Sequence, residues 1–303
     1  MTFPAPLHTS RPHGRWTVHA IQAGGQQLDG GAMFGVVPKP LWERKLPADS
    51  RNRIPMGMRC LLVEHEAGLV LIDTGAGHKE TEKFYGIYGI ENSPAEAGLP
   101  DDPGPTALEA GIRAAGFAPD DVRYVVNTHL HFDHAGGNTV RAAGGEILPA
   151  FTNAQYIVQR GEYDYAQNAN ERTAASYFPD NYVPLHDAGV LAFAEGEGEL
   201  LPGLRLIPTP GHTPHHQSVL LTDGDATLCF LGDVVPTQWH LPLPWIMGYD
   251  VEPLVTLESK RWLLRRAVVE RWTVVFEHDS QVAWGEVAHD AKGYRLAETG
   301  GAA

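Results

Sequence analysis

One short stretch of the chain concentrates side chains that bind metal ions. Residues 125–138 read VVNTHLHFDHAGGN and place His129, His131, Asp133 and His134 within six positions. Buried in an ordinary core, each of these polar groups would need its own partner. A metal ion provides one partner for several of them, and alternation along the turn directs His129 and His131 to one point and Asp133 and His134 to another. The spacing therefore predicts two metal ions close together.

Three further candidate ligands lie downstream, each at the junction of an apolar run and a loop. They are His212 in TPGHTP, Asp233 in FLGD and His278 in FEHD. Such junctions combine a rigid scaffold with access to solvent. One cluster cannot complete the ligand shells of two metal ions, but these three residues can.

Short apolar runs and helical patterns alternate along the chain and define the scaffold. The runs predicted to be strands are Cys60–Val63, Val70–Ile72, Val122–Val126, Tyr156–Val158, Leu204–Ile207, Ser218–Leu221, Thr227–Leu231 and Thr273–Phe276. Helices are predicted over Pro105–Ala115 and over Glu252–Glu270, the latter with Leu254, Leu257, Leu264 and Val268 at helical spacing. This pattern predicts a layered α/β fold. We expect a single domain over residues 1–303, with an N-terminal extension (1–58) and an insertion around 78–104.

Composition excludes several classes of protein. The 303 residues carry a formal net charge of −14, which argues against a nucleic-acid groove. Only two cysteines are present, Cys60 and Cys229, so neither a disulfide framework nor a Cys-rich zinc site is expected, and both are interpreted as buried thiols. No apolar run is long enough to span a bilayer or to resemble a signal peptide. The expectation is a cytoplasmic protein without a membrane partner.

At this point the sequence resembles the metallo-β-lactamase superfamily of binuclear hydrolases, and within it the quorum-quenching N-acyl homoserine lactone lactonases. The resemblance covers about residues 15–285. The matching segments are 71–75 (LIDTG), 128–138 (THLHFDHAGGN), 156–163 (YIVQRGEY), 208–218 (PTPGHTPHHQS), 276–279 (FEHD) and, for one lactonase-like branch, 29–40 (DGGAMFGVVPKP).

The resemblance implies a four-layer αβ/βα sandwich and two divalent metal ions, Zn²⁺ first, with Fe, Co or Mn as alternatives. Carried over residue by residue, it assigns one ion to His129, His131 and His212. It assigns the other to Asp133, His134 and His278. Asp233 would bridge both ions.

The implied reaction is opening of a lactone ring by a metal-activated water. Asp133 would take the proton of that water and pass it to the leaving alkoxide. Many of these lactonases have a Tyr three residues after the bridging Asp, where this chain has Pro236, so Trp239, His240 and Tyr249 are the candidate replacements. Phe34 and Met58 are candidate substrate contacts in an acyl-chain pocket.

Other groups near the motifs are interpreted as supports. Asp73, His215 and His216 are expected to hold the ligand loops through hydrogen bonds rather than to bind metal. The aromatic segment 78–104 is expected either to cover the site or to form a contact between two copies of the chain.

Two alternatives stay open. The same metal ligands serve phosphotriesterases, arylesterases and thioesterases such as glyoxalase II, although the substrate-binding extension of glyoxalase II is not expected in the 25 residues after His278. A more distant alternative is a non-catalytic, metal-stabilised binding protein. In the main interpretation the partner is a small-molecule substrate.

Overall fold

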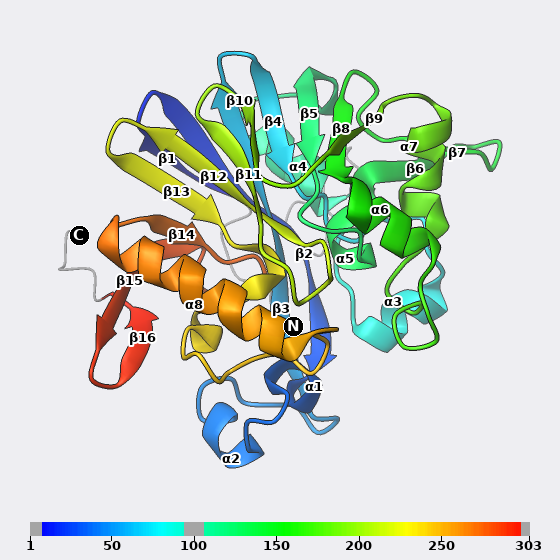
Figure 1. Ribbon diagram of the computed structural model, residues 1–303. Coiled ribbons are helices and arrows are strands. Elements are labelled where there is room, and N and C mark those ends of the chain that lie inside the picture. The colour runs from blue at the N-terminus through cyan, green and yellow to red at the C-terminus, as the bar shows by residue number, and fades with distance from the viewer. Residues whose placement is uncertain (1–7, 94–105, 298–303) are drawn as a thin grey trace. The chain divides into compact units, whose positions relative to one another are not determined.

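The computed structural model describes residues 8–93 and 106–297, and these divide into two compact units (Figure 1). The first unit comprises the described parts of 1–26 and 57–198, and the second those of 27–56 and 199–303. A single domain over 1–303 stays a prediction. Of the predicted N-terminal extension, residues 1–7 lie outside the described residues, as do residues 94–104 of the predicted insertion.

A mixed seven-stranded sheet forms most of the first unit, in the order β1-β2-β3-β4-β5-β8-β9. β3 and β4 pair antiparallel. The pairs β4–β5, β5–β8 and β8–β9 are parallel. Both faces of a parallel sheet are usually covered by other elements, so its strands are continuous apolar runs. For this reason the sequence predicts β4, β5 and β8. The strands are β1 (His8–His13), β2 (Trp16–Asp29), β3 (Arg53–His65), β4 (Gly68–Ile72), β5 (Val122–Val126), β8 (Gln155–Gln159) and β9 (Leu191–Ala194), with a separate pair of β6 (Thr139–Arg141) and β7 (Ile147–Pro149).

Short helices surround this sheet. α4 (Ala107–Ala114) begins at Thr106, whose hydroxyl accepts a hydrogen bond from Glu109 N, and its Leu108 and Ile112 are buried in the cluster that contains Val125. The predicted helix over 105–115 is therefore confirmed from Thr106 onward. The other α-helices of the unit are α3 (Glu82–Tyr88), α5 (Phe132–Ala135), α6 (Arg160–Gln167) and α7 (Val183–Asp187).

The second unit contains the other seven-stranded sheet, in the order β10-β11-β12-β13-β14-β15-β16. β11, β12 and β13 are antiparallel, and β13 and β14 are parallel. The strands are β10 (Gly198–Leu201), β11 (Leu204–Pro208), β12 (Gln217–Asp223), β13 (Ala226–Phe230), β14 (Thr273–Val275), β15 (Trp284–Asp290) and β16 (Gly293–Leu296).

α8 (Pro253–Val269) packs on this second sheet, and Figure 1 shows it in orange beside β13 and β14. Leu263, Leu264 and Ala267 are buried in one cluster with residues of β13 and β14. The predicted apolar stripe was partly wrong, because Leu254 is 78% exposed. The helix instead packs on the sheet through Leu263 and Ala267. The buried Lys260 donates from Nζ to the Pro242 and Trp245 carbonyls.

The N-terminal part of the second unit is a compact apolar cluster. α1 (Gly30–Phe34) and α2 (Lys39–Trp42) pack with Met56 and Met247, so segments far apart in the sequence share one core. Within residues 8–93 and 106–297 the structure also contains five 3₁₀ helices: Pro119–Asp121, Gly136–Asn138, Pro179–Asn181, Gly232–Val234 and Gln238–His240.

The α/β fold class is confirmed by two mixed sheets with helices. Each of the eight predicted strands overlaps an observed strand, and the largest difference is in β3, which begins at Arg53 rather than at Cys60. Cys60 and Cys229 are buried free thiols, as expected. Within residues 8–93 and 106–297, no helix has the length and apolar character needed to cross a membrane.

Candidate metal centre

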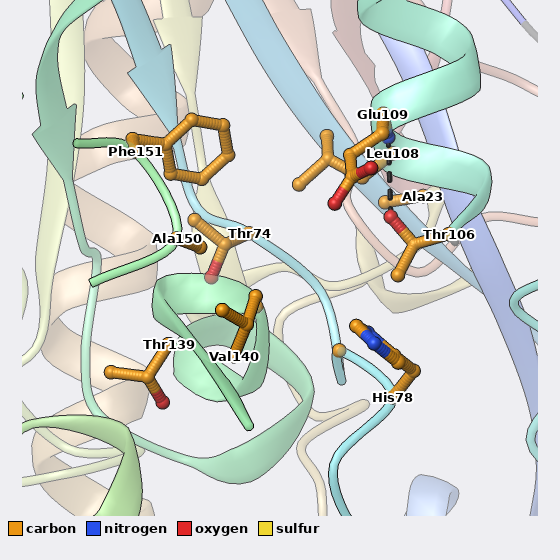
Figure 2. A pocket seen from close by; sticks show the side chains of 12 residues that line it. Ala23, Thr74, His78, Thr106, Leu108, Glu109, Thr139, Val140, Ala150 and Phe151 are labelled. Carbon is orange, nitrogen blue, oxygen red and sulfur yellow. Dashed lines mark hydrogen bonds between the residues drawn. The ribbon is translucent and has the colours of Figure 1, made fainter. Parts of the chain in front are cut away.

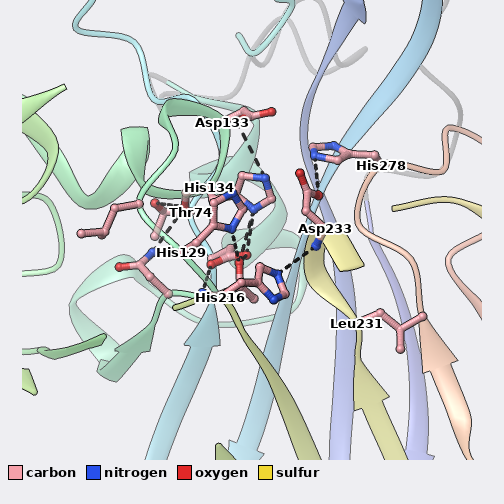
Figure 3. A network of polar contacts seen from close by, with 12 residues as sticks. Thr74, His129, Asp133, His134, His216, Leu231, Asp233 and His278 are labelled. Carbon is pink, nitrogen blue, oxygen red and sulfur yellow. Dashed lines mark hydrogen bonds and ion pairs between the residues drawn. The ribbon is translucent and has the colours of Figure 1, made fainter. Parts of the chain in front are cut away.

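Four of the predicted ligands lie in the first unit, in the turn that follows β5. His129, His131, Asp133 and His134 are all at most 8% exposed. The His129 ring centroid lies 3.9 Å from that of His134 and 4.5 Å from that of His131. His134 Nε2 lies 3.8 Å from Asp133 Oδ1 (Figure 3). The structure therefore gathers three imidazoles and one carboxylate at one strand end.

Glu162 fixes the middle of this ligand loop. Its Oε1 accepts hydrogen bonds from Leu130 N at 3.1 Å and from the Tyr177 hydroxyl at 2.9 Å. Phe132 N donates to Ser176 O at 2.9 Å. These two backbone hydrogen bonds hold Leu130 and Phe132 in place. They thereby fix the backbone of the intervening and flanking residues 129, 131 and 133. Sequence reasoning noted the segment around Glu162 without seeing this role.

Asp73 orients two residues of the ligand loop, as expected. Its Oδ1 accepts from Thr128 N and its Oδ2 from the Thr128 hydroxyl, both at 2.7 Å. His134 Nδ1 lies 3.1 Å from Asp73 Oδ2 and is the donor of this pair, because an ionised carboxylate only accepts. The proton on Nδ1 leaves His134 Nε2 with a lone pair for a metal ion.

Gly136 and Gly137 are needed for space rather than for an unusual turn. Gly136 has an ordinary helical φ of −61°, a conformation that any residue can adopt. A Cβ on Gly136 would collide with Ala76 O, and one on Gly137 with Thr74 O. The glycines allow the end of the ligand loop to pack directly on the turn that contains Asp73.

The second unit holds the other three predicted ligands around one carboxylate. Asp233 Oδ2 lies 3.2 Å from His212 Nε2. Asp233 Oδ1 lies 3.1 Å from His278 Nε2 (Figure 3). All three side chains are at most 5% exposed. His212 follows β11, Asp233 follows β13 and His278 follows β14, so the strand-end positions match those read from the sequence.

A hydrogen bond to Asp250 orients the ring of His212. His212 Nδ1 donates to Asp250 Oδ1 at 2.9 Å, which leaves Nε2 for the metal. The sequence offered no local signal for Asp250, because its role depends only on where the fold places it.

His216 supports Asp233 through the backbone. Its Nε2 accepts from Asp233 N at 3.1 Å, so its proton resides on Nδ1, which is 2.8 Å from Thr209 Oγ1. The expected supporting role is confirmed for His216. The neighbouring His215 is exposed.

The donor sets fit divalent metal ions by their chemistry. Neutral imidazoles and carboxylates are the usual ligands of Zn²⁺ and similar ions, and Asp73 and Asp250 each prepare a His for binding through Nε2. The two carboxylate oxygens of Asp233 each lie near a different imidazole nitrogen. Such buried groups of His and Asp are consistent with a binuclear metal site.

Comparison with known proteins identifies the family. The model of the metallo-β-lactamase superfamily matches residues 58–278. The chain belongs to this superfamily. It is 33% identical over 226 residues to an N-acyl homoserine lactonase from a Bacillus species, a match that covers 73% of this chain and 80% of the relative.

Solved structures agree on the metallo-β-lactamase fold. A probable metal-dependent hydrolase from Staphylococcus aureus is similar with a TM-score of 0.83 and 28% identity, covering 95% of this chain and 99% of that one. An N-acyl homoserine lactone hydrolase, solved with N-hexanoyl-L-homoserine at its catalytic metal center, gives a TM-score of 0.65 and 26% identity, covering 88% and 94%. With its His-rich clusters, the chain is a metal-dependent hydrolase of the superfamily.

Two of the predicted substrate contacts belong to the core of this metallo-β-lactamase superfamily protein. His240 is 1% exposed and stacks on Phe34, which is fully buried, with 4.6 Å between ring centroids. His240 Nε2 donates to Met33 O and Nδ1 accepts from the Thr237 hydroxyl, both at 2.8 Å. Burial lowers the pKa of His240 to about 3. We therefore interpret both residues as packing groups.

The remaining substrate candidates differ in exposure. Met58 is fully buried and packs in one cluster with Phe132. Trp239 is half-buried and Tyr249 is 39% exposed. Trp239 and Tyr249 therefore keep surface available to a ligand.

An aromatic cluster adjoins Asp133 in the first unit. Phe132 packs against Tyr88 and Phe84 of α3, with ring centroids 4.7 Å and 5.0 Å apart, and against Phe178. Burial, and next the negative charge of Asp133, raises the pKa of Tyr88. Sequence analysis singled out Tyr88 and Phe84 only as members of an aromatic segment and did not connect them with Phe132.

A small pocket in the first unit lies behind the ligand loop (Figure 2). Its lining includes Thr74, Gly137 and Thr139, together with Leu108 of α4. Its lining includes His78 but none of the predicted metal ligands. We do not assign the substrate to this pocket.

Proposed function

We propose that this protein opens the lactone ring of N-acyl homoserine lactones with two divalent metal ions, as a quorum-quenching enzyme. The observation that carries the proposal is the carboxylate of Asp233, which presents one oxygen to His212 and the other to His278. Similarity to lactonases over about three quarters of the chain supports the substrate class. Zinc as the native metal, a homodimer and a cytoplasmic location remain predictions.

The proposed ligand sets are the ones that membership of the superfamily implies. One ion is assigned to His129, His131 and His212. The second ion is assigned to Asp133, His134 and His278. Asp233 is assigned to both ions.

Ions bound in this way lower the pKa of a water molecule and polarise an ester carbonyl. The carbonyl carbon gains a bond to the oxygen of water, and its bond to the ring oxygen breaks. Asp133 is the base that receives the proton of the attacking water, and it then delivers this proton to the ring oxygen as that oxygen leaves. The product is an N-acyl homoserine with a free hydroxyl and a carboxylate, and the second proton of the water is released to solvent.

The aromatic cluster of Phe84, Tyr88, Phe132 and Phe178 is proposed to contact the acyl chain. It adjoins the catalytic carboxylate through Phe132, the residue just before Asp133. Aromatic rings in such a position bury apolar surface of a substrate at low entropic cost. Trp239 and Tyr249 are proposed as further contacts, since Pro236 cannot supply the hydroxyl that many lactonases place at this point.

Steady-state kinetics on a substrate panel test the proposal. The metal-loaded protein is assayed with N-hexanoyl-L-homoserine lactone, paraoxon, an aryl ester and a glutathione thioester. We expect kcat/KM to be highest for the lactone and to fall by ~10²-fold or more in Asp133→Asn. Higher turnover of paraoxon or the thioester by orders of magnitude would assign the other activity. Absence of hydrolysis with two ions bound would favour a binding protein.

A further inference from the structure

A buried glutamine from a distant strand contacts the proposed catalytic carboxylate. Gln26 lies on β2, is fully buried, and donates from Nε2 to Asp133 Oδ2 at 2.5 Å. The two residues are 107 positions apart and lie in the same unit. Nothing in the ligand motif itself requires this contact.

The direction of the Gln26 side chain is fixed by chemistry. An ionised carboxylate only accepts hydrogen bonds, so the amide nitrogen and not the amide oxygen must face Asp133. Hydrogen bonds to a charged acceptor are shorter and stronger than neutral ones. A neutral donor also holds the carboxylate without adding a positive charge that would compete with a metal ion for it.

Gln22 on the same strand shows what a purely structural glutamine does here. Its Nε2 donates to Gly24 O at 2.5 Å, and its Oε1 accepts from Arg59 Nη2 at 3.3 Å. Gln26 Oε1, in contrast, is buried and has no hydrogen-bond partner within the described part of the chain. A buried acceptor without a partner is costly. The fold tolerates that cost while keeping the Gln26 donor on Asp133.

The local backbone explains how Gln26 reaches this position. Gly24 has a φ of +126°, and a Cβ there would lie 2.8 Å from both Glu91 O and Met58 Cε. Gly25 exchanges two backbone hydrogen bonds with Glu91. Only glycine at position 24 permits this close approach. The next residues of β2, including Gln26, thereby come to lie next to the ligand loop.

We infer that Gln26 is a positioning residue that sets the orientation of the Asp133 carboxylate for proton transfer. The terminal torsion of an aspartate is broad and nearly two-fold, so the side chain alone does not select which oxygen faces the reaction. A donor on Oδ2 makes that selection and leaves Oδ1 on the side of His134 Nε2, 3.8 Å away. The inference rests on the proposed role of Asp133.

The test compares Gln26→Met with Gln22→Met, a matched change on the same strand. Loss of a positioning donor is expected to lower kcat for N-hexanoyl-L-homoserine lactone by ~10- to 100-fold, with KM changed less than ~3-fold. Gln26→Asn, which keeps the amide but is one methylene shorter, should give a loss of the same kind. Gln22→Met should leave kcat near the wild-type value.

Two further measurements separate positioning from folding. Both Met variants should retain two metal ions per chain and similar melting temperatures. In the Co²⁺-substituted proteins, the visible ligand-field spectrum should change in Gln26→Met and not in Gln22→Met, because only Gln26 contacts a proposed ligand. A Gln26→Met protein that loses metal, or one with unchanged kcat and spectrum, overturns the inference.

A second substrate separates positioning from direct contact. An alkyl γ-lactone without the amide should lose the same factor in Gln26→Met. A loss confined to the amide-bearing lactone would mean that Gln26 Oε1 binds the substrate amide, and would overturn the positioning role. If the wild type cleaves no lactone, the proposed function fails, and Gln26 is then tested on whichever ester the wild type cleaves.

Discussion

Asp233 contacts His278 through its Oδ1, which lies 3.1 Å from His278 Nε2. The other oxygen, Oδ2, lies 3.2 Å from His212 Nε2. A carboxylate shared between two imidazoles in this way has the donor geometry of a bridging ligand. The His216 ring holds the Asp233 backbone, so the arrangement is built into the second unit itself.

Asp233→Asn should cost the protein at least one metal ion. An amide is neutral and presents only one oxygen, so it cannot serve two cations as a carboxylate does. We expect metal content by mass spectrometry to fall from two ions per chain to one or fewer, and activity to fall by ~10²-fold or more. Asp225→Asn, at an exposed turn, is the control and should keep both ions. Full metal content in Asp233→Asn would exclude a bridging role.

His216→Ala should weaken metal binding although His216 is not a proposed ligand. The change leaves Asp233 N without its buried acceptor and frees the loop that carries the carboxylate. Loss of such a support typically costs ~10- to 100-fold in metal affinity or activity. Chelator competition measures the affinity. His215→Ala, one residue away and exposed, should behave as wild type; equal effects of the two changes would contradict the role of His216.

Stability should fall in mild acid because of His240. Burial lowers its pKa to about 3, whereas an unfolded His titrates near 6.5, so between these values only the unfolded state binds the proton. The stability that the neutral ring contributes is present above pH 6.5 and is lost as the pH falls toward 3. Between pH 7 and pH 5, the unfolding free energy should therefore drop by about 2 kcal/mol more in wild type than in His240→Gln. Parallel urea-denaturation curves in the two proteins would show that His240 is not buried and neutral.

Tyr88→Ala should reduce the preference for long acyl chains. Its ring packs on Phe132 beside Asp133, so removing it opens the apolar surface proposed to contact the chain. We expect kcat/KM for N-decanoyl-L-homoserine lactone to fall by ~10-fold, and that for the butanoyl compound to change little. Ile87→Ala on the same helix, 55% exposed, is the control. An equal loss for both chain lengths would place the acyl chain elsewhere.

Much of the scaffold was predictable because its buried strands are short apolar runs. β5, β11, β13 and β14 end next to the proposed ligands, and the sequence marked all four. β1, in contrast, reads HTSRPH, without the apolar alternation that identifies a strand, and it forms by pairing with β2. Its existence depends on a neighbour rather than on its own pattern.

The same distinction separates ligands from their supports. The proposed metal ligands cluster in motifs or stand at strand ends, where residue type and position together are informative. Glu162, Asp250 and Gln26 are single residues whose roles arise only when the fold brings them to Leu130, His212 and Asp133. We interpret His240 and Phe34 as packing groups for the converse reason, since an aromatic residue near a site in sequence is often part of the core.

A metal titration is the most direct test of the proposal that this protein is a lactonase with two metal ions. Metal-free protein is titrated with Zn²⁺ while ring opening of N-hexanoyl-L-homoserine lactone is followed by proton release. Activity should be absent without metal and should rise to a plateau at two ions per chain. A plateau at one ion, or no ring opening with two ions bound, would contradict it.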